Sequence, residues 1–136
     1  GEFYECTDWA CNPKPVRAEG IPIWLGGESK KQLERIGKYG DGWLATPRSV
    51  PKLKDDFAIA QEAASNAGRD PSKLVIAIEG AGILAPDRLE KVAEGLGRLR
   101  EMGVAHAILG VHPAHMANAS PLLEEFASKH LAAAKG

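Results

Sequence analysis

The chain has 136 residues, of which 44% are apolar and 26% charged, and its formal net charge at pH 7 is −1. This length and composition are typical of one globular domain, while the even balance of charge excludes a strongly basic surface for nucleic acid or an anionic membrane. The longest apolar runs, residues 21–25 and 74–78, are far shorter than the ~20 residues of a membrane span, so we expect no membrane partner.

An irregular leader is expected over residues 1–20, and it contains both cysteines, Cys6 and Cys11. Two isolated thiols do not make a disulfide framework, and they fit the reducing cytoplasm. The C-x4-C spacing could hold a metal, but no second Cys or His pair lies nearby to complete a tetrahedral set, so we expect no metal site. Because the chain begins with Gly1 and not Met, we also expect that sequence upstream is missing.

From residue 21 onward, short apolar runs alternate with segments of helical period, as in βα units around a parallel sheet. Four such units can be counted. Their strands are continuous apolar runs rather than alternating ones, which indicates a sheet covered on both faces. The strands are expected over residues 21–25, 42–45, 74–78 and 106–111.

The first two helices have recognisable end signals. The first begins near Ser29, which with Gln32 fits a capping box, and it ends at Gly40. The second runs from about Pro51 to Ala67. The positions expected to face the core are Leu33, Ile36 and Tyr39 in the first helix, and Leu53, Phe57, Ala60, Ala64 and Ala67 in the second.

The third strand leads through a loop with Gly80 and Gly82 to a helix that is capped at Asp87 and ended by Gly103. The last helix begins near Ser120, which is followed by proline at the first helical position. The core-facing stripe of the third helix is expected to consist of Leu89, Val92, Leu96, Leu99 and Met102.

The pattern predicts an α/β fold of the (β/α)8, TIM-barrel type. Residues 25–29 lack the third glycine of the dinucleotide-binding fingerprint, and no acidic residue follows where a ribose contact would fall, which argues against a Rossmann fold. A complete barrel takes ~250 residues. Four units over residues 21–136 are therefore expected to form half of one.

Four segments in this order and spacing carry a family resemblance: residues 13–16, 21–29, 40–43 and 67–71. Together with the closing strand and helix, they resemble the second half of luciferase-like monooxygenases, most closely the deazaflavin-dependent (coenzyme F-420) members. The resemblance implies that the four strands are the fifth to the eighth of the barrel. It also implies an oxidoreductase or monooxygenase that uses coenzyme F-420 or FMN on a small organic substrate.

This chain departs from the family in one respect. Most groups that line the reactive face of the flavin or deazaflavin in that family come from the second, third and fourth strands, which are absent here. Catalytic residues are therefore unknown, and we expect little or no oxidoreductase activity from the chain alone. The alternative function is a non-catalytic half-barrel that binds a phosphate-bearing ligand or only assembles with other chains.

A cofactor-binding site is predicted at Gly26, Gly27, Glu28 and Ser29, between a strand end and a helix start. Glycines let the backbone approach a ligand closely, and the free N–H groups and dipole of a helix N-terminus favour a phosphate. The resemblance points to the same junction. The alternative is that the glycines only make a tight turn and that Ser29 only caps its helix.

Residues around the second strand are further candidates. Thr46 is expected to contact the ring system of the cofactor beside Ala45, whereas Trp43 has the size of a core residue. Asp41 precedes that strand, at the opposite end of the barrel, and is interpreted as a turn residue rather than an acid catalyst.

Three titratable residues, Glu79, His112 and His115, follow the third and fourth strands. A histidine there could act as a general acid, and the alternative is a hydrogen bond within its loop. Lys30 and Lys31 either face solvent or attract the acidic tail of a deazaflavin coenzyme.

A half-barrel leaves the edges of its first and fourth strands unpaired, and apolar edges invite strand addition. We therefore expect a homo-oligomer, most simply a twofold dimer that rebuilds eight strands. Pairing through helix faces or exchange of the leader are alternatives.

Overall fold

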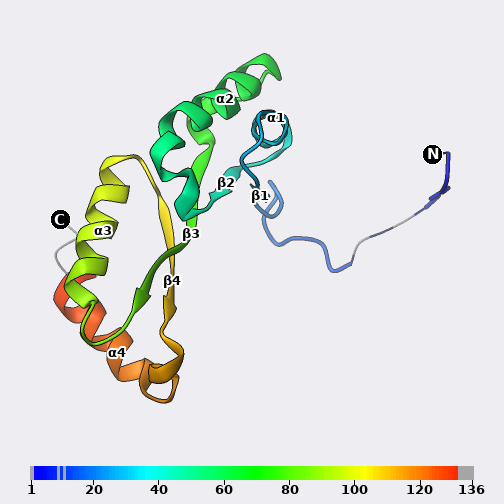
Figure 1. Cartoon of the computed structure of the whole chain (residues 1–136). Coiled ribbons are helices and arrows are strands. Elements are labelled where there is room, and N and C mark those ends of the chain that lie inside the picture. The colour runs from blue at the N-terminus through cyan, green and yellow to red at the C-terminus, as the bar shows by residue number, and fades with distance from the viewer. Residues whose placement is uncertain (1, 9, 11, 132–136) are drawn as a thin grey trace.

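The computed structural model describes residues 2–8, 10 and 12–131 of the chain (Figure 1). Four parallel strands form one sheet in the order β1-β2-β3-β4, each paired with the next along the chain. The strands are β1 (Trp24–Gly26), β2 (Gly42–Ala45), β3 (Val75–Leu84) and β4 (His106–Val111). The predicted α/β class and the four βα units are confirmed, and β2 and β4 have the predicted bounds.

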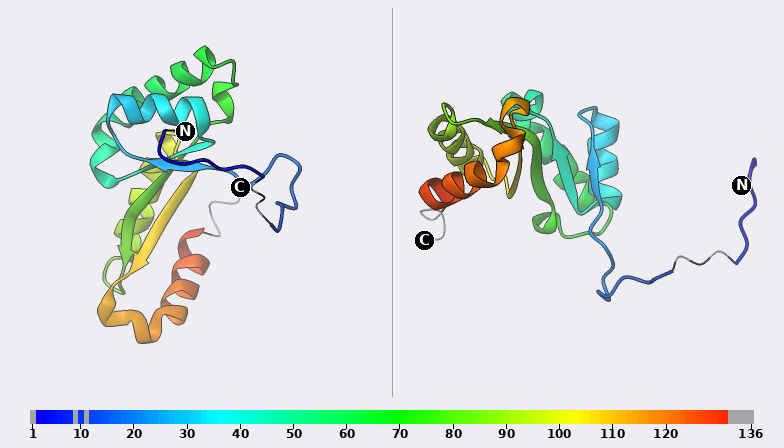
Figure 2. Two further views of the ribbon diagram at one scale, coloured as in Figure 1. Left: turned by 90° about the vertical axis from the view of Figure 1, so that its right-hand side faces the viewer. Right: turned by 90° about the horizontal axis from the view of Figure 1, so that it is seen from below.

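A helix follows every strand, and short 3-10 turns precede two of these helices. The helices are α1 (Lys30–Tyr39), α2 (Leu53–Asn66), α3 (Leu89–Glu101) and α4 (Ala119–Phe126), with turns at Pro47–Lys52, Pro71–Lys73 and Pro113–Asn118 and a π-helical turn at Ala127–Leu131. Helices α1 and α2 lie side by side, α3 runs along β3 and β4, and the leader extends away from the body (Figure 2). No helix of the described residues is long and apolar enough to cross a membrane.

Helix α1 shows how the sequence signals act. The hydroxyl of Ser29 accepts from the N–H of Gln32 at 3.3 Å, as the capping box predicts, but the Gln32 side chain accepts from Arg35 instead of completing the box. The expected core position Tyr39 is wrong, because its side chain is 70% exposed. Gly37 lies on the buried face of α1 instead. An added Cβ at Gly37 would overlap the backbone of α2, so the two helices approach each other closely there.

The third unit departs most from the prediction. Strand β3 is twice as long as expected, because Gly80 takes φ +70° and the pairing with β4 shifts its register between Glu79 and Gly82. A glycine in this conformation makes a β-bulge, after which the strand continues. Asp87 does not cap α3, whose N-cap position is Arg88. Both expectations, the loop at Gly80 and the cap at Asp87, are wrong.

The core lies between the sheet and its helices, in two clusters. Ala67, expected at the core, is exposed, and Ala63 is buried in its place. The cluster under α1, α2 and the end of α3 contains Leu33, Ile36, Trp43, Ala45, Leu53, Ala60, Ala64, Leu74, Ile76, Ile78 and Leu99. The cluster under α3 and α4 contains Leu84, Leu89, Val92, Leu122 and Phe126.

The opposite face of the sheet is open. On this side Trp24, Ile83 and Ile108 are 36%, 48% and 46% exposed. The prediction that both faces are covered is therefore wrong for the chain by itself, although the apolar strands are those of a buried sheet. The reason is that the second cover of a barrel sheet comes from the strands across the barrel.

Candidate functional site

The strand-to-helix junction after β1 is shaped by one glycine. Gly27 has φ +111°, and an added Cβ would lie 2.7 Å from Cγ of Gln32. At Gly26 an added Cβ would meet only the Leu44 carbonyl oxygen at an ordinary 3.7 Å. Gly27 is thus required by the turn itself, whereas Gly26 is not. All four predicted residues of this junction, 26–29, are exposed.

Trp43 holds this junction in place. Its side chain is fully buried, as the size argument predicted, and its indole Nε1 donates to the carbonyl oxygen of Gly27 at 2.9 Å. Sequence reasoning missed this hydrogen bond, since only the pairing of β1 with β2 brings Trp43 next to the loop. The loop after β1 is therefore anchored to the adjacent strand.

The anchored carbonyl determines where the next N–H points. In a trans peptide the C=O of one residue and the N–H of the next point in opposite directions. With its carbonyl directed at Trp43, Gly27 leaves the N–H of Glu28 facing away from that indole. Within the described part of the chain, the N–H groups of Glu28, Ser29, Lys30 and Lys31 have no acceptor. These are the unpaired donors of a helix N-terminus, where partial positive charge accumulates.

Glu28 links the junction to the neighbouring loop. Its Oε1 accepts from the hydroxyl of Thr46 at 2.5 Å and from that of Ser49 at 2.8 Å. These two hydrogen bonds, the first being the stronger influence, hold the pKa of the Glu28 carboxyl below its usual range. The structure thus joins two of the predicted site residues, Glu28 and Thr46, by a hydrogen bond.

Ser49 is the member of this group that the sequence analysis missed. It is buried, its Oγ accepts from the N–H of Thr46 at 3.2 Å, and it stands three residues after Thr46 in a capping-box arrangement. The Thr-x-x-Ser spacing before a helix could have identified it. Because the Thr46 hydroxyl already donates to Glu28, it is left as an acceptor rather than a donor toward a ligand.

Asp41 occupies the other end of β2. Its carboxylate accepts from the N–H of Ile23 at 2.9 Å and pairs with Arg69 at 3.0 Å. The guanidinium of Arg69 also donates to the carbonyls of Gly37 and Gly40 at the end of α1. Asp41 therefore ties chain segments together at the face away from the junction, in agreement with its interpretation as a structural residue.

Among the described residues, the remaining candidates make no hydrogen bond to this group. Glu79 stands within β3, not after it, because of the bulge. His112 accepts from the N–H of Ala114 through Nδ1 at 3.3 Å, and its ring centroid lies 5.8 Å from that of His115. His112 thus caps its own turn, which is the alternative that the sequence left open.

Two further sequence interpretations concern metal ligands and charge. In the described ranges, no three His, Cys, Asp or Glu side chains gather as a metal site would require. Cys6 is an exposed free thiol, and Cys11 lies outside the described residues, so its role stays a prediction. Lys30 and Lys31 are both exposed in the first turn of α1, beside the free N–H groups.

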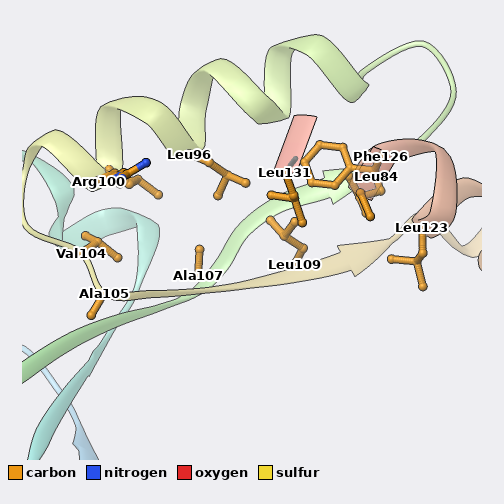
Figure 3. A pocket seen from close by; sticks show the side chains of 12 residues that line it. Leu84, Leu96, Arg100, Val104, Ala105, Ala107, Leu109, Leu123, Phe126 and Leu131 are labelled. Atoms are coloured by element: carbon orange, nitrogen blue, oxygen red, sulfur yellow. The ribbon is translucent and has the colours of Figure 1, made fainter. Parts of the chain in front are cut away.

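A separate apolar hollow of about 690 Å³ lies between α3, β4 and α4 (Figure 3). Leu96, Leu109 and Phe126 point into it, and Arg100 is the one charged residue of its lining. It is on the helix side of the sheet and contains no pair of groups for acid–base chemistry. The junction after β1 is accordingly the better functional candidate.

Comparison with known proteins identifies relatives of nearly the whole chain. The family model for luciferase-like monooxygenases matches residues 1–134. An uncharacterized protein of Mycobacterium tuberculosis is 29% identical over 131 residues, covering 95% of this chain and 42% of that protein. An F420-dependent hydroxymycolic acid dehydrogenase of the same species is 33% identical over 79 residues, covering 57% of this chain and 21% of that enzyme.

Solved structures show the same fold. An F420-dependent secondary alcohol dehydrogenase, in complex with an F420-acetone adduct, has a TM-score of 0.67 at 18% identity, covering 82% of this chain and 48% of that one. The coenzyme F420-dependent tetrahydromethanopterin reductase of Methanopyrus kandleri has a TM-score of 0.60 at 12% identity, covering 81% and 50%. The chain therefore spans about half the length of these relatives, or less.

Proposed function

Because the chain belongs to the luciferase-like monooxygenase family, we propose that the complete protein is an oxidoreductase dependent on coenzyme F-420, and that this part holds the cofactor phosphate. The phosphate would bind the backbone of residues 27–29 and the first turn of α1. Bound there, the deazaflavin would carry the hydride, while the protein orients it.

The observation that carries this proposal is the pair formed by Trp43 and Gly27. The indole fixes the Gly27 carbonyl at 2.9 Å, so the N–H of Glu28 faces away from it together with the free donors of the helix N-terminus. Such a set of N–H groups suits a phosphate, whose oxygens accept several hydrogen bonds. The missing side chain at Gly27 leaves room for close approach.

Glu28 does not conflict with an anion at this site. Its carboxylate keeps its charge, but Oε1 is directed to the hydroxyls of Thr46 and Ser49 in the neighbouring loop. The two exposed lysines at the start of α1 add positive charge on the other side. The residues at the junction therefore fit a phosphate group.

Coenzyme F-420 is favoured over FMN for two reasons. The hydroxymycolic acid dehydrogenase and both solved structures are described as F420-dependent. In addition, Lys30 and Lys31 lie where they could attract an acidic extension beyond the phosphate. FMN remains the competing ligand in the test, since its phosphate would suit the same donors.

The test is a titration of the 15N-labelled chain with inorganic phosphate, followed by NMR. The amides of residues 28–31 should shift together and saturate, because their N–H groups become hydrogen-bonded. Chloride at equal ionic strength is the control, as it screens charge without replacing a tetrahedral oxyanion. Shifts that are absent, or that cluster elsewhere, would contradict the site.

The alternative function is a half-barrel without catalysis, which would bind a phosphate-bearing ligand or only assemble with other chains. We propose that the isolated chain binds the cofactor through its phosphate and turns over slowly or not at all. Redox turnover by pure chain at a rate comparable with full-length relatives would contradict this. Binding without turnover would support it.

A further inference from the structure

The loop after β1 is tied to the second βα unit at two points, one through its backbone and one through a side chain. The backbone tie is the hydrogen bond from the indole of Trp43 to the carbonyl oxygen of Gly27. The side-chain tie is made by Glu28, whose Oε1 accepts from the hydroxyl of Thr46 at 2.5 Å and from that of Ser49 at 2.8 Å. None of the side-chain atoms in this second tie is among the N–H donors of the phosphate site, so the tie needs an explanation of its own.

The side-chain tie is built into the loop after β2 and is not a chance surface contact. Ser49 is only 2% exposed and is the buried polar residue of the described part of the chain. Its Oγ accepts from the N–H of Thr46 at 3.2 Å and donates to Glu28, so its donor and one acceptor position are both in use. Thr46 is half-buried at the start of the turn Pro47–Lys52. The two hydroxyls are therefore held in place on the protein side of the tie.

The carboxylate of Glu28 is an anion directly before a helix. Ser29 is the N-cap of α1, and Glu28 is the residue before it. Because the hydroxyls of Thr46 and Ser49 hold the pKa of the Glu28 carboxyl below its usual range, the group is ionised at neutral pH and can only accept hydrogen bonds. Side-chain oxygens and negative charges bind the free N–H groups of a helix start, as phosphates do. An untied Glu28 could thus occupy the donors that a phosphate needs.

We propose that Thr46 and Ser49 are positioning residues for the phosphate site, whose hydroxyls hold the Glu28 carboxylate on the loop after β2 and keep it from binding the N–H groups at the start of α1. This inference rests on the proposed binding of a phosphate at those N–H groups. With the carboxylate held aside, the donors need no rearrangement before the anion binds, which preserves affinity. Neither hydroxyl has to touch the phosphate, since each already donates to Glu28.

The competing explanation is a purely structural tie that only joins two loops. The two explanations differ in what the charge of Glu28 does. If the tie restrains a competing anion, the Thr46 hydroxyl must lose its importance for phosphate binding once the charge is removed. If the tie only joins loops, the hydroxyl must matter equally after Glu28→Gln, because the amide oxygen of the new side chain accepts the same hydrogen bonds.

The test is a titration with inorganic phosphate, followed by NMR of the 15N-labelled full chain, in a double-mutant cycle. Thr46→Val removes the hydroxyl and should weaken phosphate binding about tenfold, the effect of a hydrogen bond to a charged group. Glu28→Gln should bind phosphate at least as tightly as the wild type, because it removes a negative charge. Adding Thr46→Val to Glu28→Gln should change the phosphate affinity by no more than about twofold.

Thr46→Ser is the matched control, because it retains the hydroxyl and should bind phosphate like the wild type. Circular dichroism shows whether each variant is folded. If Thr46→Val does not fold, Ser49→Ala removes the other hydroxyl and makes the same comparison with and without Glu28→Gln.

The cycle separates the positioning role from the phosphate site itself. If the wild-type amides of residues 28–31 do not respond to phosphate, the site is wrong and the positioning role is wrong with it. If they respond and folded Thr46→Val binds phosphate as tightly as the wild type, the site stands and only the positioning role is overturned. An equal loss of affinity with and without Glu28→Gln would also overturn that role, since the tie would then be structural.

Discussion

The indole of Trp24 and the imidazole of His106 are in ring contact, with centroids 4.9 Å apart and planes inclined by 45°, from the first and the last strand of the sheet. The contact spans β2 at Gly42, where an added Cβ would lie 2.8 Å from Cδ1 of Trp24 and 2.9 Å from Cγ2 of Val75. The indole of Trp24 can therefore reach His106 across the curved sheet only because Gly42 has no side chain in its way.

Replacing Gly42 with alanine should therefore destabilise the fold. The new methyl group must displace the indole or Val75, and overpacking of this kind costs about 1–3 kcal/mol. Urea denaturation followed by tryptophan fluorescence measures the change. Gly110→Ala is the control, because no atom lies within 4 Å of a Cβ there. Equal stabilities of the two variants would contradict the packing argument.

Trp43→Phe should weaken phosphate binding, because it removes the indole N–H that orients the Gly27 peptide. We also expect a loss of stability of about 1–3 kcal/mol from the unpaired carbonyl and the smaller ring. Trp24→Phe is the matched control, since Trp24 lies on the open face of the sheet. Phosphate affinity is measured by the NMR titration, and an unchanged affinity in folded Trp43→Phe would show that the indole does not orient the site.

Glu28 should make stability depend on pH in acid. Its pKa is lowered in the folded state by the hydroxyls of Thr46 and Ser49, so its contribution is present above the unfolded pKa of about 4.3 and is lost as pH falls through the folded value. In Glu28→Gln this part of the pH dependence should disappear. Urea midpoints from pH 7 to pH 3 test the sign, and a variant that follows the wild-type curve would refute it.

Arg69 should resist even a conservative change. Its guanidinium donates hydrogen bonds to the carbonyls of Gly37 and Gly40 and to the carboxylate of Asp41. A lysine cannot reproduce them, because it lacks the planar fork of N–H donors. Arg69→Lys should cost about 1–3 kcal/mol. Arg88→Lys is the control, because its pair with Asp87 is exposed at 3.8 Å and is worth ~0–1 kcal/mol. The free energy of unfolding in urea distinguishes the two.

The sequence predicted the secondary structure well where it depends only on residues close together in the chain. Strand β2 and the cap at Ser29 follow from an apolar run and a hydroxyl before a helix, and both are as predicted. The bulge at Gly80 was missed because a glycine in a strand can mark a loop or a bulge, and only the partner strand decides. Asp87 has the cap spacing, yet α3 begins after Arg88.

The site was predictable only in part, because its hydrogen bonds join separate segments. The location of the junction after β1 follows from the βα pattern and the glycine pair. The bonds from Thr46 and Ser49 to Glu28, and from Trp43 to Gly27, depend on the register that pairs Gly26 with Leu44. The contact of Trp24 with His106 depends on the curvature of four strands, which no local pattern contains.

Binding of coenzyme F-420 to the whole chain tests the central claim most directly. The cofactor's absorbance is followed during titration with the chain, in the presence and absence of inorganic phosphate, with FMN titrated in parallel. We expect saturable binding of F-420 that phosphate competes away and that is tighter than the binding of FMN. No binding, or binding that excess phosphate leaves unchanged, would contradict the assignment of the junction after β1 as the site of the cofactor phosphate.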